Sequence, residues 1–387
     1  MPVSNFISKT FKDFVRSQQF SGILLLLMTA ISLSIANSRF ADGYHHFFED
    51  EFHFAGFHMS HLHIINEGLM TVFFLLVGLE IKREFVRGEL SGFEKASLPV
   101  AAAIGGMLVP ALLYTTWNAG TSTAGGWGIP MATDIAFAIG ILSLAGNKVP
   151  NSLKVLLTAI AVVDDLGAVL VIAIFYTSAL NLFYGLLMMA TFILLLLLNK
   201  FGVKNLIVYL LPGFALWYFT LMSGIHSTIA GVLLAITIPL TGKENSPLEK
   251  LEHALHTPVN LFVMPLFALA NTIITIGGNA GEAATGKAGL GIISGLFIGK
   301  PVGIVVSILL LLKLGVSRLP EGISKKHLIG MGLLGGIGFT MSIFISLLAF
   351  KEAEMISSAK LSILIASLLS GLVGYVTLKN SRNAERR

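Results

Sequence analysis

Two adjacent aspartates, Asp164 and Asp165, lie in the middle of an apolar run from about residue 153 to residue 176. A helix of this length, rising about 1.5 Å per residue, is long enough to cross the hydrocarbon core of a bilayer. A charge at that depth costs about 2.5 kcal/mol or more, so an ionisable residue there is first considered as a functional site. Because neighbouring helix residues point about 100° apart, the two carboxylates must face different partners. Their chemistry would be cation binding or proton exchange; the alternatives are a pair neutralised by a structural counter-ion, or a helix in the core of a soluble protein.

Three further polar residues interrupt other apolar runs: Thr133, Asp134 and Lys300. Sodium is a hard ion that prefers oxygen ligands, which carboxylates, carbonyls and a threonine hydroxyl supply. Burial and like-charge repulsion make protons compete with cations for the same groups. Three carboxylates and one amine therefore favour a small-cation site that also exchanges protons.

Two of the apolar runs are predicted to form poor helices. The run 127–145 begins just after a Gly-Gly pair and contains Pro130 and Thr133-Asp134, and the run 328–350 contains five glycines. Each interior glycine costs about 1 kcal/mol relative to alanine, so the second run is expected to unwind where Gly335, Gly336 and Gly338 precede Thr340. Close packing of small residues between membrane helices is the alternative.

The composition indicates a polytopic helical membrane protein. Of 387 residues, 55% are hydrophobic and only 12% are charged, and the chain has no cysteine, whereas soluble domains carry about 25% charged residues. The apolar runs are continuous and do not alternate, which excludes a β-barrel. The predicted spans number twelve, counted along the chain: 22–36, 61–81, 96–117, 127–145, 152–176, 182–199, 206–219, 225–240, 255–274, 289–312, 328–350 and 356–378.

The two poor helices are the fourth and eleventh of these spans, and their odd separation means that they cross the bilayer in opposite directions. Segments 96–176 and 289–378 are therefore predicted to form an inverted repeat, each with an interrupted middle helix. Such a pair is a strong sequence indication of a transporter site.

The basic residues set the predicted orientation. Segments assigned to the inner side hold 21 of the 26 lysines and arginines and the outer segments hold four, which places both termini inside. Residues 1–20 are expected to form an amphipathic helix on the cytoplasmic surface, 21–378 a single transmembrane transporter domain, and 379–387 a basic cytoplasmic tail. A cleaved signal peptide is an alternative for the N-terminus, but the charge count favours an uncleaved first span. This distribution requires no nucleic-acid partner.

The outer segment of about residues 44–59 is predicted to form a hairpin, because Phe52 and Phe54, then Phe57 and Met59, alternate around Ala55-Gly56. Its histidines show no metal-ligand spacing, so an interface loop is the preferred interpretation.

Five motifs resemble, almost end to end along the chain, those of the NhaA family of sodium/proton antiporters. In chain order they are Val77-Gly78-Leu79-Glu80-Ile81-Lys82-Arg83-Glu84, Ala132-Thr133-Asp134-Ile135-Ala136-Phe137, Val163-Asp164-Asp165-Leu166-Gly167-Ala168, Gly299-Lys300-Pro301 and Gly336-Ile337-Gly338-Phe339-Thr340-Met341-Ser342. The resemblance implies a bacterial inner-membrane antiporter without a cofactor. It would exchange sodium or lithium for a larger number of protons and would be activated at alkaline pH.

The resemblance also implies roles for single residues. Asp165 would be the main Na+ or Li+ ligand together with Asp164, and Asp164 would pair with Lys300 when sodium is absent. Thr133 and Asp134 would flank the site and help to balance the dipoles of the broken helices. A homodimer joined through the outer hairpin is implied as well, although segment 44–59 departs most from the family pattern.

The family's pH response lies at the cytoplasmic mouth, where two groups of ionisable residues are candidates. Residues on one face of the second span are Glu80, Arg83 and Glu84, and residues near the start of the ninth span are Glu252, His253 and His256, beside Glu249. Histidine side chains change charge near neutral pH, and His226 matches a family histidine linked to pH response. Ordinary solvated ion pairs at helix ends are the alternative.

Two other functions are alternatives to an antiporter. Intramembrane aspartyl proteolysis also uses two buried carboxylates, but it requires them on separate helices, one after Gly-x-Gly, and in this chain Phe339 follows Gly336-Ile337-Gly338. A sodium- or proton-coupled carrier of an organic solute needs a solute pocket and often an arginine, and no predicted span contains an arginine. The chain is therefore predicted to be a transporter and not an enzyme.

Overall fold

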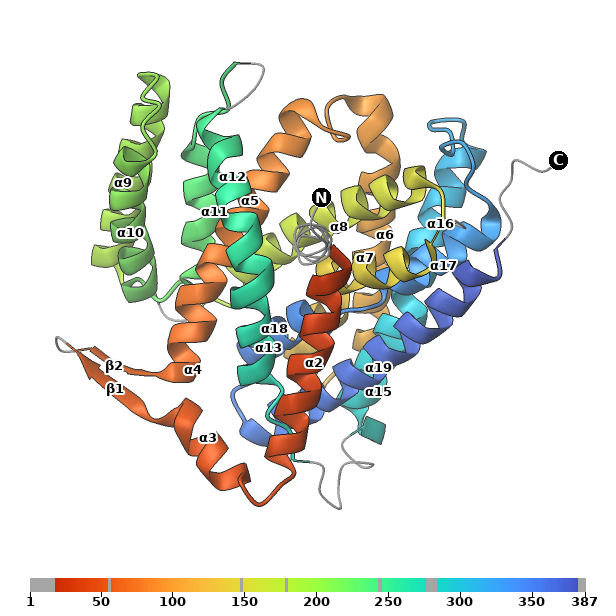
Figure 1. Ribbon diagram of the computed structural model, residues 1–387, viewed down its shortest axis with the longest axis horizontal. Helices are drawn as coiled ribbons and strands as arrows, with labels where there is room; N and C mark the ends of the chain where they lie inside the picture. Colours follow the sequence, from red (N-terminus) through yellow and green to blue (C-terminus); the bar gives the residue numbers. More distant parts are fainter. Residues whose placement is uncertain are drawn as a thin grey trace, which may run out of the picture. The chain divides into compact units, whose positions relative to one another are not determined.

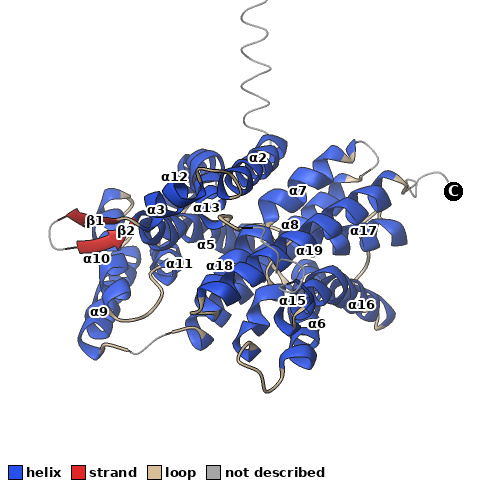
Figure 2. Ribbon diagram, turned by 90° about the horizontal axis from the view of Figure 1, so that it is seen from below, coloured by secondary structure: helices blue, strands red, loops and turns tan. Residues whose placement is uncertain are grey.

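The computed structural model describes residues 18–54, 57–146, 149–177, 180–242, 246–275 and 284–381. Within these ranges the chain is mostly helical, with two short strands (Figure 2). Seven helices are long and apolar enough to cross a membrane, or up to ten if each of three bent helix pairs is one span. Two shorter apolar helices, Ile207–Met222 and Thr228–Thr237, fall outside that number. The polytopic helical class is confirmed, and the number of twelve spans stays a prediction.

The chain divides into two compact units. Unit 1 comprises Met1–Ser34, Phe93–Asp164 and Ile274–Arg387, and unit 2 comprises Ile35–Gly92 and Asp165–Ile273. The boundary falls between the two aspartates inside helix α8 (Asn151–Phe175), which therefore belongs to both units.

Unit 1 consists of helices, several of them interrupted (Figure 1). Besides most of α2 (Gln18–Ala36) and the first half of α8, its described elements are α6 (Phe93–Asn118), the 3-10 helix η2 (Ala124–Met131), α7 (Ile135–Leu144), α15 (Lys287–Ser294), the π-helix η5 (Gly295–Gly299), α16 (Lys300–Lys313), α17 (Lys325–Gly335), α18 (Phe339–Ala349) and α19 (Ala353–Lys379). The pairs η2/α7 and α17/α18 are bent by 40° and 41° at short breaks.

Helices α6 and α16 of unit 1 pack with their backbones in contact. A Cβ added at Gly303 would lie against the Gly105 carbonyl and 3.1 Å from the Gly106 nitrogen. A Cβ at Gly106 would lie 2.8 Å from the Ile304 side chain. Small residues thus bring the helix that begins with Lys300 against α6, as is usual between membrane helices.

Unit 2 contains two strands and a group of packed helices. Besides the second half of α8, its described elements are α3 (Ala41–Glu49), β1 (Glu51–Phe54), β2 (Phe57–Ser60), α4 (His61–His63), the π-helix η1 (Ile64–Leu69), α5 (Met70–Arg87), α9 (Leu182–Lys200), α10 (Ile207–Met222), α11 (Thr228–Thr237), α12 (Pro247–Pro258), the π-helix η4 (Val259–Val263) and α13 (Met264–Asn271). Its hydrophobic core includes Leu79 of α5, Leu195 of α9, Leu216 of α10, Leu234 of α11 and Leu251 of α12.

Several predicted boundaries differ from those observed. The segment expected as a hairpin begins within helix α3, and only β1 and β2 pair as antiparallel strands, with Phe52 opposite Met59. The predicted span 225–240 contains a helix of only ten residues, Thr228–Thr237. The predicted span 255–274 starts earlier, at Pro247, because Ser246 and Glu249 form a capping box there. The hairpin tip at 55–56, segment 1–17 of the expected N-terminal amphipathic helix and residues 382–387 of the tail lie outside the described residues.

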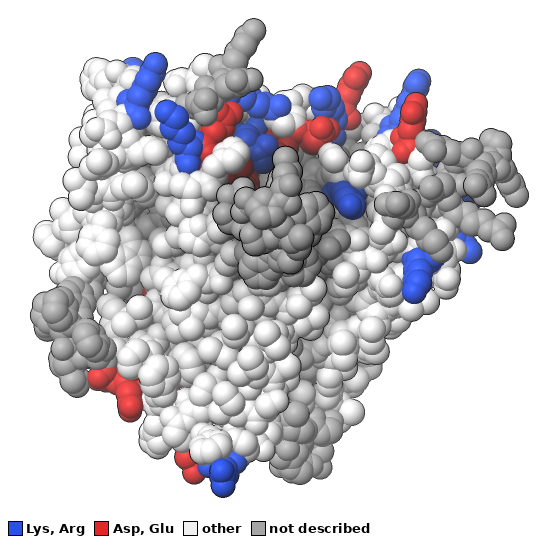
Figure 3. All heavy atoms as spheres, in the orientation of Figure 1, with Lys and Arg blue, Asp and Glu red and all other residues white. Residues whose placement is uncertain are grey.

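Uncharged side chains cover most of the face drawn in Figure 3. Many large apolar side chains are exposed, including Leu182 and Leu186 on α9 and Leu211 and Phe214 on α10. Exposed apolar surface of this extent is unusual for a soluble protein and fits a surface that faces lipid.

Candidate functional site

The two helix breaks of unit 1 are joined by hydrogen bonds. The Asp134 backbone nitrogen donates to the Ile337 carbonyl oxygen at 2.7 Å, and the Thr133 hydroxyl lies 2.9 Å from the Gly335 carbonyl oxygen. Each break therefore supplies partners for backbone groups that the other leaves outside a helix. The contact brings together residues about 200 positions apart in the sequence.

Asp134 connects the two breaks with one carboxylate. Its Oδ1 accepts a hydrogen bond from the Phe137 nitrogen at 3.0 Å, which caps the N-terminus of α7. Its Oδ2 accepts from the Thr340 nitrogen at 3.2 Å and from the Thr340 hydroxyl, at the N-terminus of α18. An acidic group is favourable at the positive end of a helix, and this one serves two such ends.

The second break requires glycine at Gly336. A Cβ there would run into the Leu296 carbonyl oxygen of η5 and would lie 2.9 Å from the Ser370 hydroxyl and 3.1 Å from the Leu333 carbonyl oxygen. The Phe339 nitrogen just beyond the break donates to the Ser367 hydroxyl of α19 at 3.1 Å. The glycine run of the sequence thus lets η5 and α19 approach the backbone at the break.

Lys300 and Asp164 form a fully buried ion pair. The Lys300 Nζ lies 2.7 Å from the Asp164 Oδ2, and both side chains have 0% exposure. Lys300 also donates to the Met131 carbonyl oxygen at the end of η2. The amine therefore holds the Asp164 carboxylate and the negative end of a short helix together.

Thr133 completes the surroundings of the Asp164 carboxylate. Its hydroxyl is 2.7 Å from the same Oδ2 and also reaches the Gly335 carbonyl oxygen, but it has a single proton to donate. The other oxygen, Asp164 Oδ1, is buried and has no hydrogen-bond partner among the described residues. A buried carboxylate oxygen of this kind is available to a cation or a proton.

Asp165 is the next residue of α8 and is 1% exposed. It is the first residue of unit 2 on α8, whereas Thr133, Asp134, Asp164 and Lys300 all belong to unit 1. The structure therefore brings four of the five predicted ion-site residues together within one unit, and the fifth follows directly in the same helix.

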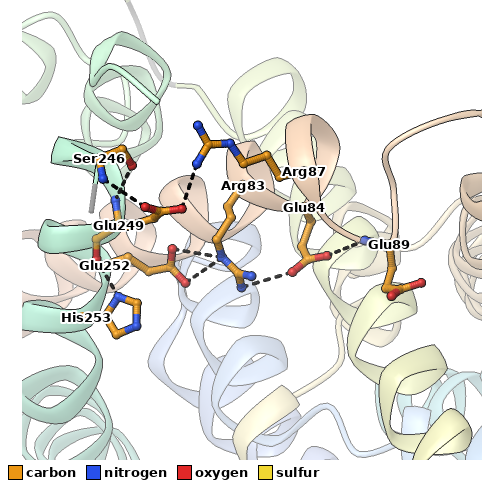
Figure 4. Close-up of polar contacts among 8 residues, drawn as sticks. All are labelled: Arg83, Glu84, Arg87, Glu89, Ser246, Glu249, Glu252 and His253. Carbon is orange, nitrogen blue, oxygen red and sulfur yellow. Dashed lines mark hydrogen bonds and ion pairs between the residues drawn. The ribbon is translucent and has the colours of Figure 1, made fainter. Parts of the chain in front are cut away.

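The predicted pH-response residues meet only in part (Figure 4). The Arg83 Nε is 3.0 Å from both carboxylate oxygens of Glu252, and its guanidinium is 3.1 Å from Glu84. A second pair, Arg87 with Glu249, also at 3.0 Å, joins α5 to α12. His253 binds the Glu249 carbonyl oxygen of its own helix at 2.7 Å.

The other predicted residues lie apart from these ion pairs. The His256 ring is 3.3 Å from the amide of Asn260, one turn further along the chain, and Glu80 forms none of the ion pairs found among the described residues. His226 lies outside α11, with its Nδ1 3.6 Å from Glu67 and its Nε2 2.8 Å from the Tyr176 carbonyl oxygen. Burial alone would lower the pKa of His226, but the hydrogen bond and charge of Glu67, with the Tyr176 carbonyl, outweigh burial and raise it.

Sequence reasoning missed two ionisable residues, Glu67 and Lys82. Glu67 accepts hydrogen bonds from Ser227, and Lys82 donates to the carbonyl oxygens of Ile236 and Ile238. Glu67 lies inside the predicted span 61–81, so the rule that singled out Asp164 would have found it. Lys82 was counted among the inner basic residues and lies within the motif 77–84, but no role was predicted for it.

The fold and this cluster together define a class of protein. Helices apolar enough to cross a membrane, two facing helix breaks and ionisable groups buried beside them are the architecture of a secondary ion transporter.

The comparison with known proteins gives the family. A family model described as "Na+/H+ antiporter 1" matches residues 12–378. The Na(+)/H(+) antiporter NhaA 1 of Flavobacterium johnsoniae is 52% identical over 374 residues, which cover 96% of this chain and 97% of the relative. The NhaA antiporter of Dechloromonas aromatica is 52% identical and covers 96% of both chains, and NhaA 1 of Clostridium beijerinckii is 49% identical and covers 99% of both. The chain belongs to the NhaA family of sodium/proton antiporters. Because this is a family of transporters, membership in it argues against the intramembrane protease alternative.

Proposed function

We propose that this chain carries Na+ or Li+ out of the cell in exchange for protons, as an electrogenic antiporter of the bacterial inner membrane activated at alkaline pH. The observation that carries the proposal is the buried Asp164 carboxylate, held by Lys300 and Thr133 on one oxygen and without a hydrogen-bond partner among the described residues on the other. A cation that binds Asp164 competes directly with the Lys300 ammonium. Membership in the family and the names of the relatives support sodium and protons as the transported ions.

The exchange follows from competition for the two aspartates. Without sodium, Asp164 is neutralised by Lys300 and Asp165 holds a proton. A sodium ion entering between the two carboxylates, with the Thr133 hydroxyl as a further oxygen ligand, displaces both the Lys300 contact and the Asp165 proton. If Lys300 also gives up its proton on separating from Asp164, two protons leave for one sodium ion and each cycle moves net charge. Exposure of the site to one side of the membrane at a time completes alternating access.

Asp134 has a supporting role in this mechanism. Its carboxylate is engaged by Phe137 and Thr340 at the N-termini of α7 and α18, so it keeps the two breaks in register while the ligands of Asp164 change. Gly335, Gly336 and Gly338 allow the second break, and the Gly335 carbonyl oxygen lies beside the site at the Thr133 hydroxyl.

The membrane arrangement belongs to the same proposal. The ten candidate spans and the two shorter apolar helices, α10 and α11, make twelve, with both termini in the cytoplasm. Segments 96–176 and 289–378 form the inverted repeat, and the bent pairs η2/α7 and α17/α18 supply its two interrupted helices. Two copies of the chain associate through the outer hairpin of about residues 44–59. Within each copy, the segments are the amphipathic N-terminus 1–20, the transporter domain 21–378 and the tail 379–387.

The pH response is assigned to ionisable residues on α5 and α12. The ion pair of Arg83 with Glu252 holds the inner end of α5 to α12, and Arg83 also pairs with Glu84 of its own helix, so a change in protonation there would alter that contact. Glu80, His253 and His256 lie on the same two helices, and His226 contributes from outside α11.

The test is sodium-driven proton release. Purified protein in proteoliposomes carrying a pH-sensitive dye receives Na+ or Li+ at several values from about pH 6.5 to about pH 8.5, the range in which neutral-range groups titrate. We expect proton movement that strengthens as pH rises. It should vanish in Asp164→Asn and Asp165→Asn and persist in the matched control Asp42→Asn, whose carboxylate is exposed on α3.

Three outcomes would contradict the proposal in different ways. No response to either cation at any pH removes the antiporter function, and sodium uptake stimulated by an organic acid then favours the solute carrier. If the response survives Asp165→Asn, the antiporter function stands but the proposed ion site is wrong. A response independent of membrane potential contradicts electrogenic exchange.

A further inference from the structure

Helix α11 is unusually short for a membrane-spanning helix. It has ten residues, Thr228–Thr237, which corresponds to about 15 Å, or half of the roughly 30 Å hydrocarbon core. At least one of its ends must therefore lie away from water, where an unsatisfied backbone group costs several kcal/mol. An end that lies there needs partners from the protein.

The N-terminal end of α11 is bound by Glu67 of η1. One carboxylate oxygen, Oε2, accepts from the Ser227 nitrogen at 3.1 Å and from the Ser227 hydroxyl at 2.6 Å. The same hydroxyl is 2.9 Å from the Glu67 carbonyl oxygen. An acidic side chain thus lies at the positive end of the helix, where it is favourable.

The C-terminal end of α11 is bound by Lys82 of α5. The Lys82 Nζ donates to the Ile236 carbonyl oxygen at 2.6 Å and to the Ile238 carbonyl oxygen at 2.5 Å. The Thr237 carbonyl oxygen between them accepts from the Asn199 amide of α9 at 2.5 Å. A basic side chain thus lies at the negative end, and the last carbonyl groups of α11 are satisfied from outside the helix.

Between these two ends the backbones of α5 and α11 touch. A Cβ added at Gly231 would lie against the Thr71 carbonyl and 2.8 Å from the Leu75 nitrogen. A Cβ at Gly78 would lie 2.7 Å from the Ala235 Cβ and 3.2 Å from the Val232 Cα. Packing this close leaves little room for one helix to slide along the other.

We propose that Glu67 and Lys82 are positioning residues that clamp α11 to α5 at both ends, so that the two helices move as one rigid pair. Both residues belong to one continuous candidate span, His61–Arg87, and they match the two ends of the α11 dipole in sign. The same span carries Arg83, whose ion pair with Glu252 joins α5 to α12. A movement at that contact therefore reaches α11 through α5. The movement is a step of transport only if the proposed exchange is correct, but the rigid pair does not depend on it.

The direct test measures the distance between α5 and α11. The chain has no cysteine, so Val86→Cys and Ile236→Cys, at side chains 58% and 47% exposed, can be spin-labelled specifically. Pulsed electron spin resonance is recorded with and without Na+ at about pH 6.5 and about pH 8.5, below and above the range where neutral-range groups titrate. We expect one narrow distance in all four conditions. A distance that changes with Na+ or pH in the otherwise native chain overturns the rigid pair.

The role of the clamp is tested in the same labelled background. Lys82→Met should broaden the distance distribution, Lys82→Arg should restore it because arginine can still donate to both carbonyl oxygens, and Lys250→Met should leave it narrow. Lys250 is an exposed lysine of α12 and loses the same charge. An unchanged distribution in Lys82→Met means that Lys82 does not hold α11.

A second variant keeps the inference testable if Lys82→Met does not fold. Glu67→Gln keeps the size of the side chain and one carbonyl acceptor but removes the charge. Loss of a charge-assisted hydrogen bond should speed amide hydrogen exchange at Ser227 and Thr228 by roughly tenfold or more. Exchange at the native rate would show that the Glu67 charge does not hold the N-terminal end.

Transport assays separate this inference from the proposed function. Lys82→Met should lower the maximal rate of sodium-driven proton release, and Lys82→Arg should recover most of it. If the native chain moves no protons in response to sodium but its labels keep one distance, the proposed function is wrong and the rigid pair stands. If Lys82→Met broadens the distance and exchange proceeds at the native rate, the clamp stands, but exchange does not need the pair and the link from the clamp to transport is wrong.

Discussion

Replacing Lys300 with methionine tests whether the buried ion pair holds unit 1 together. The Lys300 Nζ and the Asp164 Oδ2 are 2.7 Å apart and neither side chain is exposed, so the substitution leaves a carboxylate in the interior without its counter-charge. Removing one partner of such a pair costs about 3–5 kcal/mol. The cost should be greatest at alkaline pH, because at lower pH Asp164 can take up a proton and lose its unpaired charge.

The double variant Lys300→Met with Asp164→Asn shows how much of that cost comes from the interaction between the two side chains. It contains neither charge, and the asparagine oxygen can still accept from the Thr133 hydroxyl. What stays lost is the hydrogen bond to the Met131 carbonyl, worth about 1 kcal/mol. The double variant should therefore be more stable than Lys300→Met by roughly 2–4 kcal/mol.

Thermal unfolding of the purified protein in detergent, followed by its tryptophan fluorescence, measures these differences. With about 2–4 °C of midpoint shift per kcal/mol, Lys300→Met should unfold roughly 10 °C below the native chain. The control Lys313→Met removes an exposed lysine from the far end of α16 and should cost less than about 1 kcal/mol. If the two single substitutions add without recovery in the double variant, the two residues are not coupled and the reasoning is refuted.

Three further predictions concern the breaks and the contact between His226 and Glu67. Gly336→Ala should abolish sodium-driven proton release and lower the unfolding midpoint, because its Cβ meets a carbonyl of η5, and native activity would contradict that close approach. Thr340→Val keeps the shape but removes a donor to the buried Asp134, so it should cost about 1–3 kcal/mol, whereas Thr340→Ser should recover most of it. The raised pKa of His226 means that its contact with Glu67 adds stability below the ordinary pKa of 6.5, and this stability is lost as pH rises through the raised value. The native chain should therefore lose more thermal stability than His226→Gln between about pH 6 and about pH 8.5, and parallel losses would contradict the assignment.

The buried charges of unit 1 could be found from the sequence because a charge in an apolar run is conspicuous. Hydropathy alone identifies Asp134, Asp164 and Lys300, and the glycine run indicates where the chain leaves the helix. Which partner each charge meets depends on how the two breaks face each other, and these breaks are about 200 residues apart in the sequence. No local pattern carries that information, so the pairing of Asp164 with Lys300 came from family resemblance.

The length of α11 could not be predicted in the same way. The apolar run 225–240 is long enough for an ordinary helix, and nothing in its composition marks the ends at Thr228 and Thr237. Both ends are set by side chains from another segment, Glu67 and Lys82. Helix ends that depend on tertiary partners are invisible to reasoning from local propensity.

One electrostatic rule explains most of these buried and partly buried charges. Asp134 and Glu67 lie at the N-termini of short helices, and Lys82 lies at the C-terminal carbonyls of α11. Lys300 reaches the Met131 carbonyl at the end of η2. Acids at positive helix ends and lysines at negative ends are what a low-dielectric interior requires when helices stop inside it.

Asp164 and Asp165 do not fit that rule. They lie in the interior of α8, which runs unbroken from Asn151 to Phe175, so neither carboxylate has a terminus of its own helix to neutralise. The hydrogen bonds of the α8 backbone would be complete with alanine at both positions. Two buried carboxylates that the helix itself does not need are a cost to the fold, and one of them already requires a buried lysine to balance it. The helix dipoles thus account for the charges around the site, whereas the aspartate pair at its centre needs another explanation, and the proposed ion binding supplies it.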